Sequence, residues 1–446
     1  MSQKQDKPST SGSRRNFFKQ TAAVTAVAGA GSLIKTPVYG QNQAPSTGRV
    51  IGANDRINVG FIGVGTQGFN THVRQIKNNA GRHNAQAAAA CDVFSEYRDR
   101  AQQFMGIGAD DVYNDHRQLL ERNDIDAVII ATVDHWHAPV AIDSMNAGKH
   151  VLIEKPMTRY LDEGFDVYDT CKRTKRVMQI GAVFCIEKKW HQAAQLVRDG
   201  MIGPLVLGQS SYCRNSPKGE WNYTINPKLT DKSVDWTRWL GQTGMRPFNA
   251  DHFFRWRKYN PYCCGILGDL LAHKIHPLMI ASGNPEFPNR VACLGTKEIT
   301  TDRDVPDNTQ VLANFPSGYT LMVVGSTVNQ QGLPEMLRGH HGTLYFGGDK
   351  VELKPETPFG DEIDPESFSG LKPSGADFFA EHADWFNVIR NGGETQGNID
   401  LSMRAQVVIS LAEMSERMSL TLLFDEKTRK ITTGTGQEVQ PLNYPA

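Results

Sequence analysis

Two clusters of residues, far apart in the sequence, combine side chains that can move a proton. In residues 269–276 (DLLAHKIH), a helix would place Asp269 and His273 on one face and His276 beside His273. A carboxylate next to an imidazole fixes its tautomer and stabilises its charged form, as a general base requires. The second cluster is Glu154-Lys155-Pro156, at the end of a predicted strand, where Pro156 fixes the turn and a Glu-Lys pair could meet bound ligands. The two clusters together predict acid–base chemistry.

Each cluster also has a plainer interpretation. Asp and His at helical spacing can bind zinc, and Glu154 with Lys155 can form a surface ion pair worth at most about 1 kcal/mol. A third cluster, residues 134–137 (DHWH), follows a buried strand at the edge where open α/β sheets bind ligands. His135 and His137 could instead merely cap that strand. No further ligand set with clear metal spacing is present, so no metal is predicted.

A glycine-rich turn supplies the strongest single motif. Residues 57–68 (INVGFIGVGTQG) run from an apolar strand into G-x-G-x-x-G, with Gly63, Gly65 and Gly68 at the three positions. These glycines allow the tight turn, close approach to a pyrophosphate, and packing of helix on strand. The pyrophosphate would then meet the positive end of the following helix. The motif predicts a dinucleotide-binding domain.

An acidic residue at the end of the next strand indicates which dinucleotide binds. Asp92 lies 24 residues after Gly68 and follows the apolar run 86–91. A carboxylate there binds the ribose hydroxyls and repels a 2′-phosphate, which favours NAD over NADP. The residues expected to contact the cofactor are Gly63, Gly65, Thr66, Gln67, Gly68, Asp92, Thr132, His135, His137, Glu154 and Lys155.

The order of predicted elements defines the fold class, which is α/β. A parallel, doubly wound sheet is predicted from alternating strands and helices over 55–181. Residues 182–446 form a second, C-terminal domain, rich in antiparallel strands. Strands are expected at 57–62, 86–91, 125–131, 150–153, 177–181, 205–213, 291–299, 309–316, 319–328, 342–346 and 350–354, and the later helices at 188–199, 268–281, 377–391 and 400–418.

A long loop at 214–262 is predicted to shape a pocket, because aromatic faces suit sugar rings. A purely structural role for its tryptophans is an equal alternative. Arg255, Trp256 and His276 are candidates for contacting the substrate. The other loop residues singled out are Arg214, Trp221, Tyr223, Trp236 and Trp239.

The first 40 residues have the layout of an export signal, followed by a polar linker at 41–54. Residues 13–19 (SRRNFFK) match the twin-arginine motif, and the weakly apolar run 21–34 is shorter than the ~20 residues that span a bilayer. No stable membrane span is expected in the mature protein. We expect export by the twin-arginine translocase to the periplasm or beyond. Little free nucleotide is available there, so the cofactor should be tightly bound.

The charge balance argues against a nucleic-acid-binding protein, and the cysteine spacing gives no C-x-x-C motif. The formal net charge is zero, and 42 basic against 47 acidic side chains remain after residue 40. No basic stripe indicates a nucleic-acid partner. The seven cysteines show no C-x-x-C spacing and are expected to be mostly buried thiols.

Four motifs in order resemble one family. G-x-G-x-x-G, D-H-W-H, A-G-K-H-V-L-I-E-K-P and G-D-x-x-x-H-x-x-H-P are similar to the glucose–fructose oxidoreductase / inositol dehydrogenase (Gfo/Idh/MocA) family from about residue 50 onward. The resemblance implies a Rossmann domain and a C-terminal domain with a large, open, mostly antiparallel sheet, used in a homodimer or homotetramer. It implies NAD or NADP as cofactor and places the catalytic lysine at Lys155, with its Asp and His at Asp269 and His273. Leu271, His276 and residues 181–183 depart from the family pattern beside the substrate pocket.

We therefore expect an oxidoreductase that acts on a hydroxyl of a sugar, glycoside or cyclitol. The carbon gives hydride to nicotinamide C4. His273, oriented by Asp269, takes the hydroxyl proton, and Lys155 hydrogen-bonds the same oxygen. The alternative is a redox-neutral NAD-dependent glycosidase or epimerase that oxidises a sugar carbon transiently. A sugar-binding module without catalysis is disfavoured by the intact Lys-Asp-His set.

Overall fold

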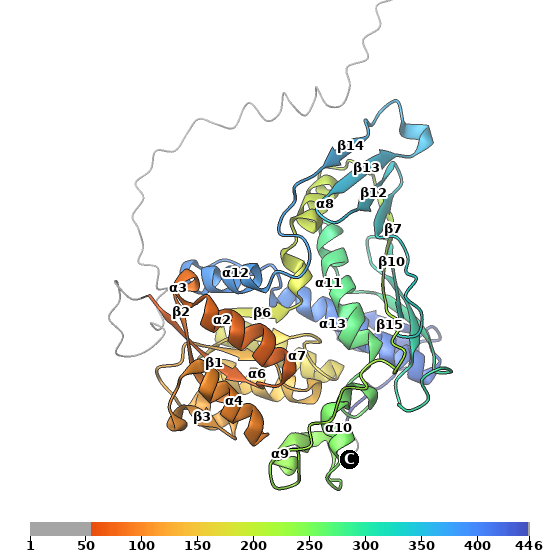
Figure 1. Ribbon diagram of the computed structural model, residues 1–446. Coiled ribbons are helices and arrows are strands. Elements are labelled where there is room, and N and C mark those ends of the chain that lie inside the picture. Colours follow the sequence, from red (N-terminus) through yellow and green to blue (C-terminus); the bar gives the residue numbers. More distant parts are fainter. Residues whose placement is uncertain (1–54, 445–446) are drawn as a thin grey trace, which may run out of the picture.

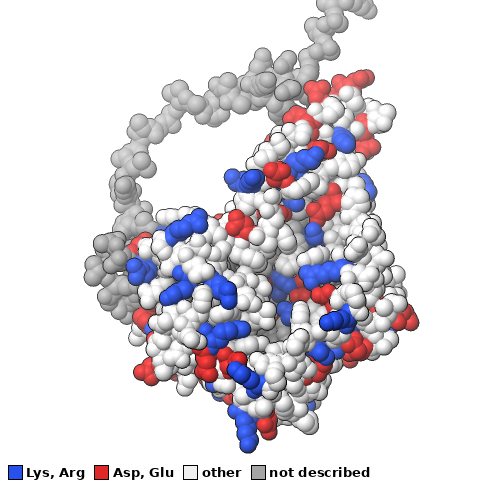
Figure 2. All heavy atoms as spheres, viewed as in Figure 1, with Lys and Arg blue, Asp and Glu red and all other residues white. Residues whose placement is uncertain are grey.

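The computed structural model describes residues 55–444, which fold around two separate sheets (Figure 1). The predicted export signal and linker lie outside the described residues. Within residues 55–444, no helix is long and apolar enough to cross a membrane. On the face drawn in Figure 2, Lys and Arg side chains are interspersed with Asp and Glu, and no large patch carries one sign of charge.

The first sheet is a six-stranded parallel sheet of order β3-β2-β1-β4-β5-β6. This is the doubly wound order of dinucleotide-binding domains, in which ligands bind where the strand order reverses beside β1. Its central strands are nearly continuous apolar runs because both faces are covered. The strands are β1 (Ile57–Ile62), β2 (Ala85–Cys91), β3 (Val112–Tyr113), β4 (Ala127–Ile130), β5 (His150–Glu154) and β6 (Met178–Gly181).

Alternation along β5 shows which helices cover each face. Val151 and Ile153 belong to the apolar cluster that contains residues of α6 and α7, whereas Leu152 packs with Trp385 and Phe386 of α12. Successive strand residues point to opposite faces, so Glu154 points to the face that α12 covers. The helices of this half are α2 (Arg74–Asn78), α3 (Ala80–His83), α4 (Ser95–Met105), α5 (His116–Leu120), α6 (His137–Asn146), α7 (Leu161–Thr174) and, from the end of the chain, α12 (Phe378–Asn391).

The second sheet has ten strands in the order β14-β13-β12-β11-β7-β10-β9-β8-β15-β16. All its pairings are antiparallel except the one between β7 and β10. Its strands are β7 (Leu205–Cys213), β8 (Arg290–Thr296), β9 (Asn308–Asn314), β10 (Thr320–Ser326), β11 (Met336–Gly339), β12 (Gly342–Phe346), β13 (Val351–Pro355), β14 (Glu366–Phe368), β15 (Leu422–Asp425) and β16 (Lys430–Thr433).

One face of this sheet is covered and the other is open. Val291, Val311 and Val323 are buried, whereas Leu294 and Leu312 are exposed. α13 packs on β8 and also contacts α7 and α11, so this buried helix joins the two halves (Figure 1). The helices of this half are α8 (Lys188–Arg198), α9 (Trp236–Leu240), α10 (Ala250–Phe254), α11 (Ala272–Ala281) and α13 (Ile399–Met418).

The structure confirms the predicted fold class and adds short elements. Segment 214–262 is not a continuous loop, because α9 and α10 form within it. The strands β3, β11, β14, β15 and β16 were not predicted. The strands expected at 309–316 and 319–328 form an antiparallel hairpin, since β9 and β10 pair across Gly318, whose φ is +96°. All seven cysteines are free, and all but Cys213 are buried.

A buried ion pair fixes α13 to the chain that follows β5. The Arg159 guanidinium donates to both carboxylate oxygens of Glu413 at 2.7 Å, and its side chain is fully buried. Glu413→Gln would leave this cation without a counter-charge, and the free energy of unfolding should fall by about 3–5 kcal/mol. Urea denaturation measures this change. Asp400→Asn, which breaks the half-exposed pair with Lys172, is the control and should cost no more than about 1 kcal/mol. Equal losses would contradict the assignment.

Candidate active site

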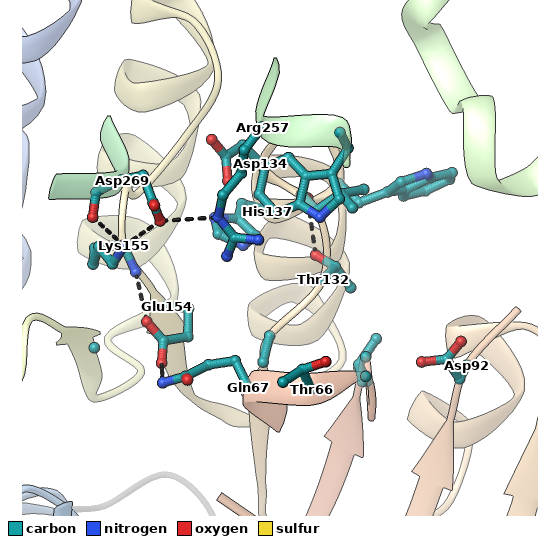
Figure 3. A pocket seen from close by; sticks show the side chains of 18 of the residues that line it. Thr66, Gln67, Asp92, Thr132, Asp134, His137, Glu154, Lys155, Arg257 and Asp269 are labelled. Carbon is teal, nitrogen blue, oxygen red and sulfur yellow. Dashed lines mark hydrogen bonds and ion pairs between the residues drawn. The ribbon is translucent and has the colours of Figure 1, made fainter. Parts of the chain in front are cut away.

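A cavity of about 590 Å³ lies where the C-terminal ends of β1, β2, β4 and β5 meet segment 214–262 and the chain leading into α11. Figure 3 shows side chains that reach the cavity from the first sheet, such as Asp92 and Glu154, and from the second half of the chain, such as Arg257 and Asp269. The cavity therefore brings together residues from the whole length of the described chain. Of the predicted site residues, its wall contains Gly63, Gly65, Thr66, Gln67, Asp92, Thr132, His137, Glu154, Lys155, Trp256, Asp269 and His273.

The glycine turn has the geometry that the motif requires. Gly63 has φ +84°, and a Cβ there would lie 2.6 Å from the backbone of Ala131. A Cβ on Gly68 would lie 2.0 Å from the carbonyl oxygen of Gly63, so Gly68 lets the helix pack on the turn. A Cβ on Gly65 would meet only the ring of Tyr97, at 3.3 Å, which leaves this backbone open to the cavity. The turn fits a bound pyrophosphate.

Asp92 marks the opposite end of the cavity from Lys155 (Figure 3). Its carboxylate accepts the backbone N–H of Val64 and of Phe94, each at 2.9 Å. Burial raises the pKa of Asp92, while these two hydrogen bonds act in the opposite direction. Each oxygen keeps a lone pair, so the carboxylate can also accept from ribose hydroxyls. Asp92 thus fits the role that its position after β2 predicts.

The other end of the cavity is built around the Asp269 carboxylate. Lys155 Nζ donates to Asp269 Oδ1 at 2.8 Å, Arg257 Nε donates to the same oxygen at 2.9 Å, and Trp221 Nε1 donates to Oδ2 at 2.8 Å. Burial would raise the pKa of Asp269, but Lys155 and Arg257 hold it well below its ordinary value. Burial would lower the pKa of Lys155, but Asp269 and then Glu154 outweigh it and raise that pKa. Lys155 is therefore a cation held against the cavity wall.

The predicted pairing of Asp269 with His273 is wrong. The chain from Leu267 to Leu271 is a π-helical turn that leads into α11, so the two residues do not have α-helical spacing. Gly268 lets this turn pack closely against Pro156, because a Cβ on residue 268 would lie 2.9 Å from the proline ring. Asp269 consequently turns to Lys155, and Nδ1 of His273 has no hydrogen-bond partner within the described residues.

His273 nevertheless lines the same cavity in a form that can accept a proton. Its ring packs edge-on against Phe184 and Tyr212. Burial, followed by the charge of Lys155, lowers the pKa of His273 to about 3. The imidazole is therefore neutral near pH 7, with a free lone pair. A pKa this low also makes His273 a weak base, so its candidacy rests on its place in the cavity wall and its free lone pair.

Four predicted contacts do not reach the cavity wall. His135 is buried and pairs through Nε2 with the carbonyl of Trp239 at 2.8 Å, so it anchors segment 214–262 rather than contacting the cofactor. His276 pairs with the Ala272 carbonyl one turn back in α11. The other two are Arg255, which binds Asp251 and the Tyr223 carbonyl, and Gly68, whose role is the packing described above.

The structure adds Arg257, which the sequence analysis did not single out, and gives partners to other residues that it did. Arg257 binds Asp269 and lies over the ring of Trp256, with its carbon Cζ 4.1 Å from the ring centroid. Asp134 is buried beside it, and burial raises the pKa of this carboxyl to about 7. Of the loop tryptophans, Trp239 and Trp256 line the cavity, Trp236 stacks on Trp239, and Trp221 holds Asp269. Within residues 55–444, no three His, Cys, Asp or Glu side chains form a metal site.

Buried histidines make stability depend on pH in a defined direction. Burial lowers the pKa of six of them from 6.5, to about 3 for His135, His150 and His273 and to about 4 for His83, His137 and His276. The folded protein keeps them neutral while the unfolded chain binds protons below pH 6.5. The free energy of unfolding should therefore fall between pH 6.5 and 4, by up to ~1.4 kcal/mol per pH unit for each histidine.

Urea titrations at a series of pH values test this expectation. His276→Gln should flatten the slope by about one proton, because it removes one of the six groups. A stability that stays constant from pH 6.5 to 4 would contradict the assignment of these rings as neutral and buried.

Comparison with known proteins agrees with this architecture. Residues 57–182 match the GFO_IDH_MocA model, described as an oxidoreductase family with an NAD-binding Rossmann fold. A glycosyl hydrolase family 109 protein of Shewanella baltica is 35% identical over 213 residues, and an alpha-N-acetylgalactosaminidase of Shewanella oneidensis is 35% identical over 212 residues. Each match covers 45% of this chain and 45% of the relative, so the chain matches less than half of either protein.

Solved structures share the fold over most of the chain. The aldose-aldose oxidoreductase of Caulobacter crescentus superposes with a TM-score of 0.62 at 19% identity, covering 83% of this chain and 100% of that one. A levoglucosan dehydrogenase in complex with NADH and levoglucosan gives 0.61 at 19% identity, covering 85% and 99%. Residues 57–182 thus match the NAD-binding Rossmann fold that the model of the Gfo/Idh/MocA oxidoreductase family describes.

Proposed function

We propose that the protein is an NAD-dependent oxidoreductase that acts on a hydroxyl-bearing carbon of a sugar, glycoside or cyclitol. The observation that carries the proposal is the wall of one cavity. A lysine cation and a neutral imidazole lie at one end, and the glycine turn with Asp92 lies along the rest. Bound NAD would supply the hydride acceptor. NAD is favoured over NADP because the Asp92 carboxylate would repel a 2′-phosphate.

The protein residues supply the acid–base part of the reaction. Bound NAD would accept hydride from the substrate carbon, and His273 would accept the hydroxyl proton as the carbonyl forms. Lys155 donates a hydrogen bond to the same oxygen and stabilises the charge that develops on it. Asp269 holds Lys155 protonated and aimed at the cavity. The products are a ketone or lactone, the reduced cofactor and one proton on His273.

Segment 214–262 supports tight retention of the cofactor. Trp239 accepts hydrogen bonds through its carbonyl from His135 and Trp136, which follow β4, and it lines the cavity. Farther along, Ser95 donates to the carbonyl of Ser233, and Phe94 packs on Phe253. A dinucleotide in this cavity would lie between the first sheet and this segment. Retention suits the proposed export, since exchange outside the cytoplasm would be slow.

A redox-neutral glycosidase is the second candidate, and the similarity to glycosyl hydrolase family 109 proteins favours it. Such an enzyme would oxidise the sugar carbon, acidify the neighbouring C–H, release the aglycone and return the hydride. Lys155 would serve either candidate, because its cation stabilises charge on the oxygen of the carbon that loses hydride. The two candidates share the cavity and differ in the net redox change.

Two measurements on the purified protein test the proposal. Mass spectrometry after denaturation should detect NAD, and a panel of sugars and cyclitols should produce near-ultraviolet absorbance of reduced nicotinamide. Aryl glycosides provide the second arm. Aglycone release without net NADH supports the glycosidase, whereas a protein that neither contains nor binds NAD or NADP would refute both candidates.

A further inference from the structure

A buried chain of hydrogen-bonded side chains runs from the cavity to α12. Glu154, at the end of β5, accepts from Gln67 Nε2 at 2.7 Å and pairs with His72 Nε2 at 3.0 Å. His72 Nδ1 lies 2.9 Å from Nε2 of His382, which comes from α12, 310 residues further along the sequence. His72 and His382 are fully buried and lie behind the cavity wall, whereas Glu154 and Gln67 line the cavity. The reaction described above uses none of these side chains.

The direction of each hydrogen bond follows from the donors available. An ionised carboxylate can only accept, so His72 Nε2 carries the hydrogen that Glu154 receives. Burial, followed by the nearby His72 and His83, lowers the pKa of His382 well below 6.5, so His382 is neutral and has one N–H. Its Nδ1 has no partner among the described residues, which places that hydrogen on Nε2, toward His72. Every N–H in the chain therefore points toward Glu154.

This arrangement keeps a single negative charge on Glu154. Burial would raise its pKa, but the hydrogen bond from His72, the charge of Lys155 and the hydrogen bond from Gln67 lower the pKa of Glu154 to about 2. Glu381 on α12 is also buried, and burial together with the charge of Glu154 raises its pKa well above its ordinary value, so it is neutral. The ionisable groups around Glu154 are His72 and Glu381 from one side of the sheet and His137, Lys155 and His273 around the cavity.

We propose that His72 and His382 are positioning residues that hold Glu154 as a carboxylate at the Lys155 end of the cavity, so that the site binds NAD⁺ more tightly than NADH. The inference rests on the proposed function, which places the nicotinamide at that end. The oxidised ring carries a positive charge that the reduced ring lacks, and a carboxylate shielded from water discriminates between them. The protein shifts the equilibrium between NAD⁺ and NADH only by the difference between its affinities for the two forms. The chain would therefore set the reduction potential of the bound cofactor.

The test compares the affinities of NAD⁺ and NADH for the full-length protein after its nucleotide has been removed. Glu154→Gln keeps the size of the side chain and removes the charge. It should raise the ratio of the NAD⁺ dissociation constant to that of NADH by about tenfold, which corresponds to a rise of about 30 mV in the cofactor's reduction potential. His382→Phe should move the ratio in the same direction by a smaller factor. His382→Gln, which keeps an N–H donor, should restore much of the effect.

A matched control is available beside the chain. His83 is buried and packs against His382 with ring centroids 6.1 Å apart, but it makes no hydrogen bond to Glu154, His72 or His382. His83→Phe should leave the ratio unchanged. A Glu154→Gln protein that loses affinity for both forms equally, or shows no change in ratio, would overturn the inference and leave a purely structural cluster. A wild-type protein that binds neither form would refute the proposed function as well, which distinguishes the two failures.

Discussion

Lys155→Ala should bind NAD as the unaltered protein does and turn over its sugar substrate roughly 10²–10³ times more slowly, the loss typical of one removed oxyanion donor. The side chain is only 10% exposed, and its ammonium is held by Asp269 at 2.8 Å. In such a site a charge acts on the developing oxyanion with little screening by water. The effect should therefore appear in kcat, with a small change in KM, because the interaction is made in the transition state.

Lys274→Ala is the matched control for this experiment. Lys274 follows His273 in α11, pairs with Glu335 at 2.5 Å, and is not among the residues that line the cavity. Its removal should change kcat less than about threefold, because its charge is paired with Glu335 and does not face the cavity. Cofactor content is measured by mass spectrometry in each variant. Unchanged turnover in Lys155→Ala with NAD still bound would remove Lys155 from the mechanism.

Asp269→Asn should slow turnover almost as much as the loss of Lys155, and it should also change the pH profile. Asp269 is the main group that raises the pKa of Lys155 against burial and the charge of Arg257. Without the carboxylate, the pKa of Lys155 falls, and the cation is lost as the pH rises through the lowered value. The variant should therefore regain activity as the pH is lowered, while the unaltered protein should keep Lys155 charged throughout the neutral range.

The double variant makes this expectation quantitative. If Asp269 acts through Lys155, the Lys155→Ala and Asp269→Asn losses should not add, because either change removes the same charged donor. Additive losses in kcat would show that Asp269 acts through another group, His273 foremost. A pH profile of Asp269→Asn that only parallels that of the unaltered protein would also contradict the structural assignment.

Long, strongly apolar elements could be predicted from the sequence, whereas short ones could not. β1, β4 and β5 are buried on both faces and read as continuous apolar runs, which the glycine turn at 63–68 then places in a parallel sheet. β3 has two residues and β14 three, too few for a periodic signal. α9 and α10 have five residues each, and they depend on aromatic packing with distant parts of the chain.

The site was predictable in its membership and less so in its pairings. Lys155 and Asp269 lie 114 residues apart, and the motifs alone indicated that both belong to the site. The partner of Asp269 depends on the π-helical turn at Leu267–Leu271. The same residues are equally compatible with an ordinary α-helix, so the sequence does not reveal this turn. His135 lies behind the cavity wall, because a position at a strand end predicts proximity to a ligand but not the direction of the side chain. The hydrogen bonds that join Glu154, His72 and His382 could not be predicted, because they form only when α12, from the end of the chain, packs on the first sheet.

Rapid mixing of the NAD-loaded protein with a panel of sugars, glycosides and cyclitols tests the central claim most directly. Either net dehydrogenation or a redox-neutral cycle should produce the near-ultraviolet absorbance of reduced nicotinamide on the enzyme, and Lys155→Ala should form it far more slowly. A protein that converts one of these substrates without any reduced cofactor appearing, at a rate that Lys155→Ala leaves unchanged, would contradict hydride transfer at this cavity.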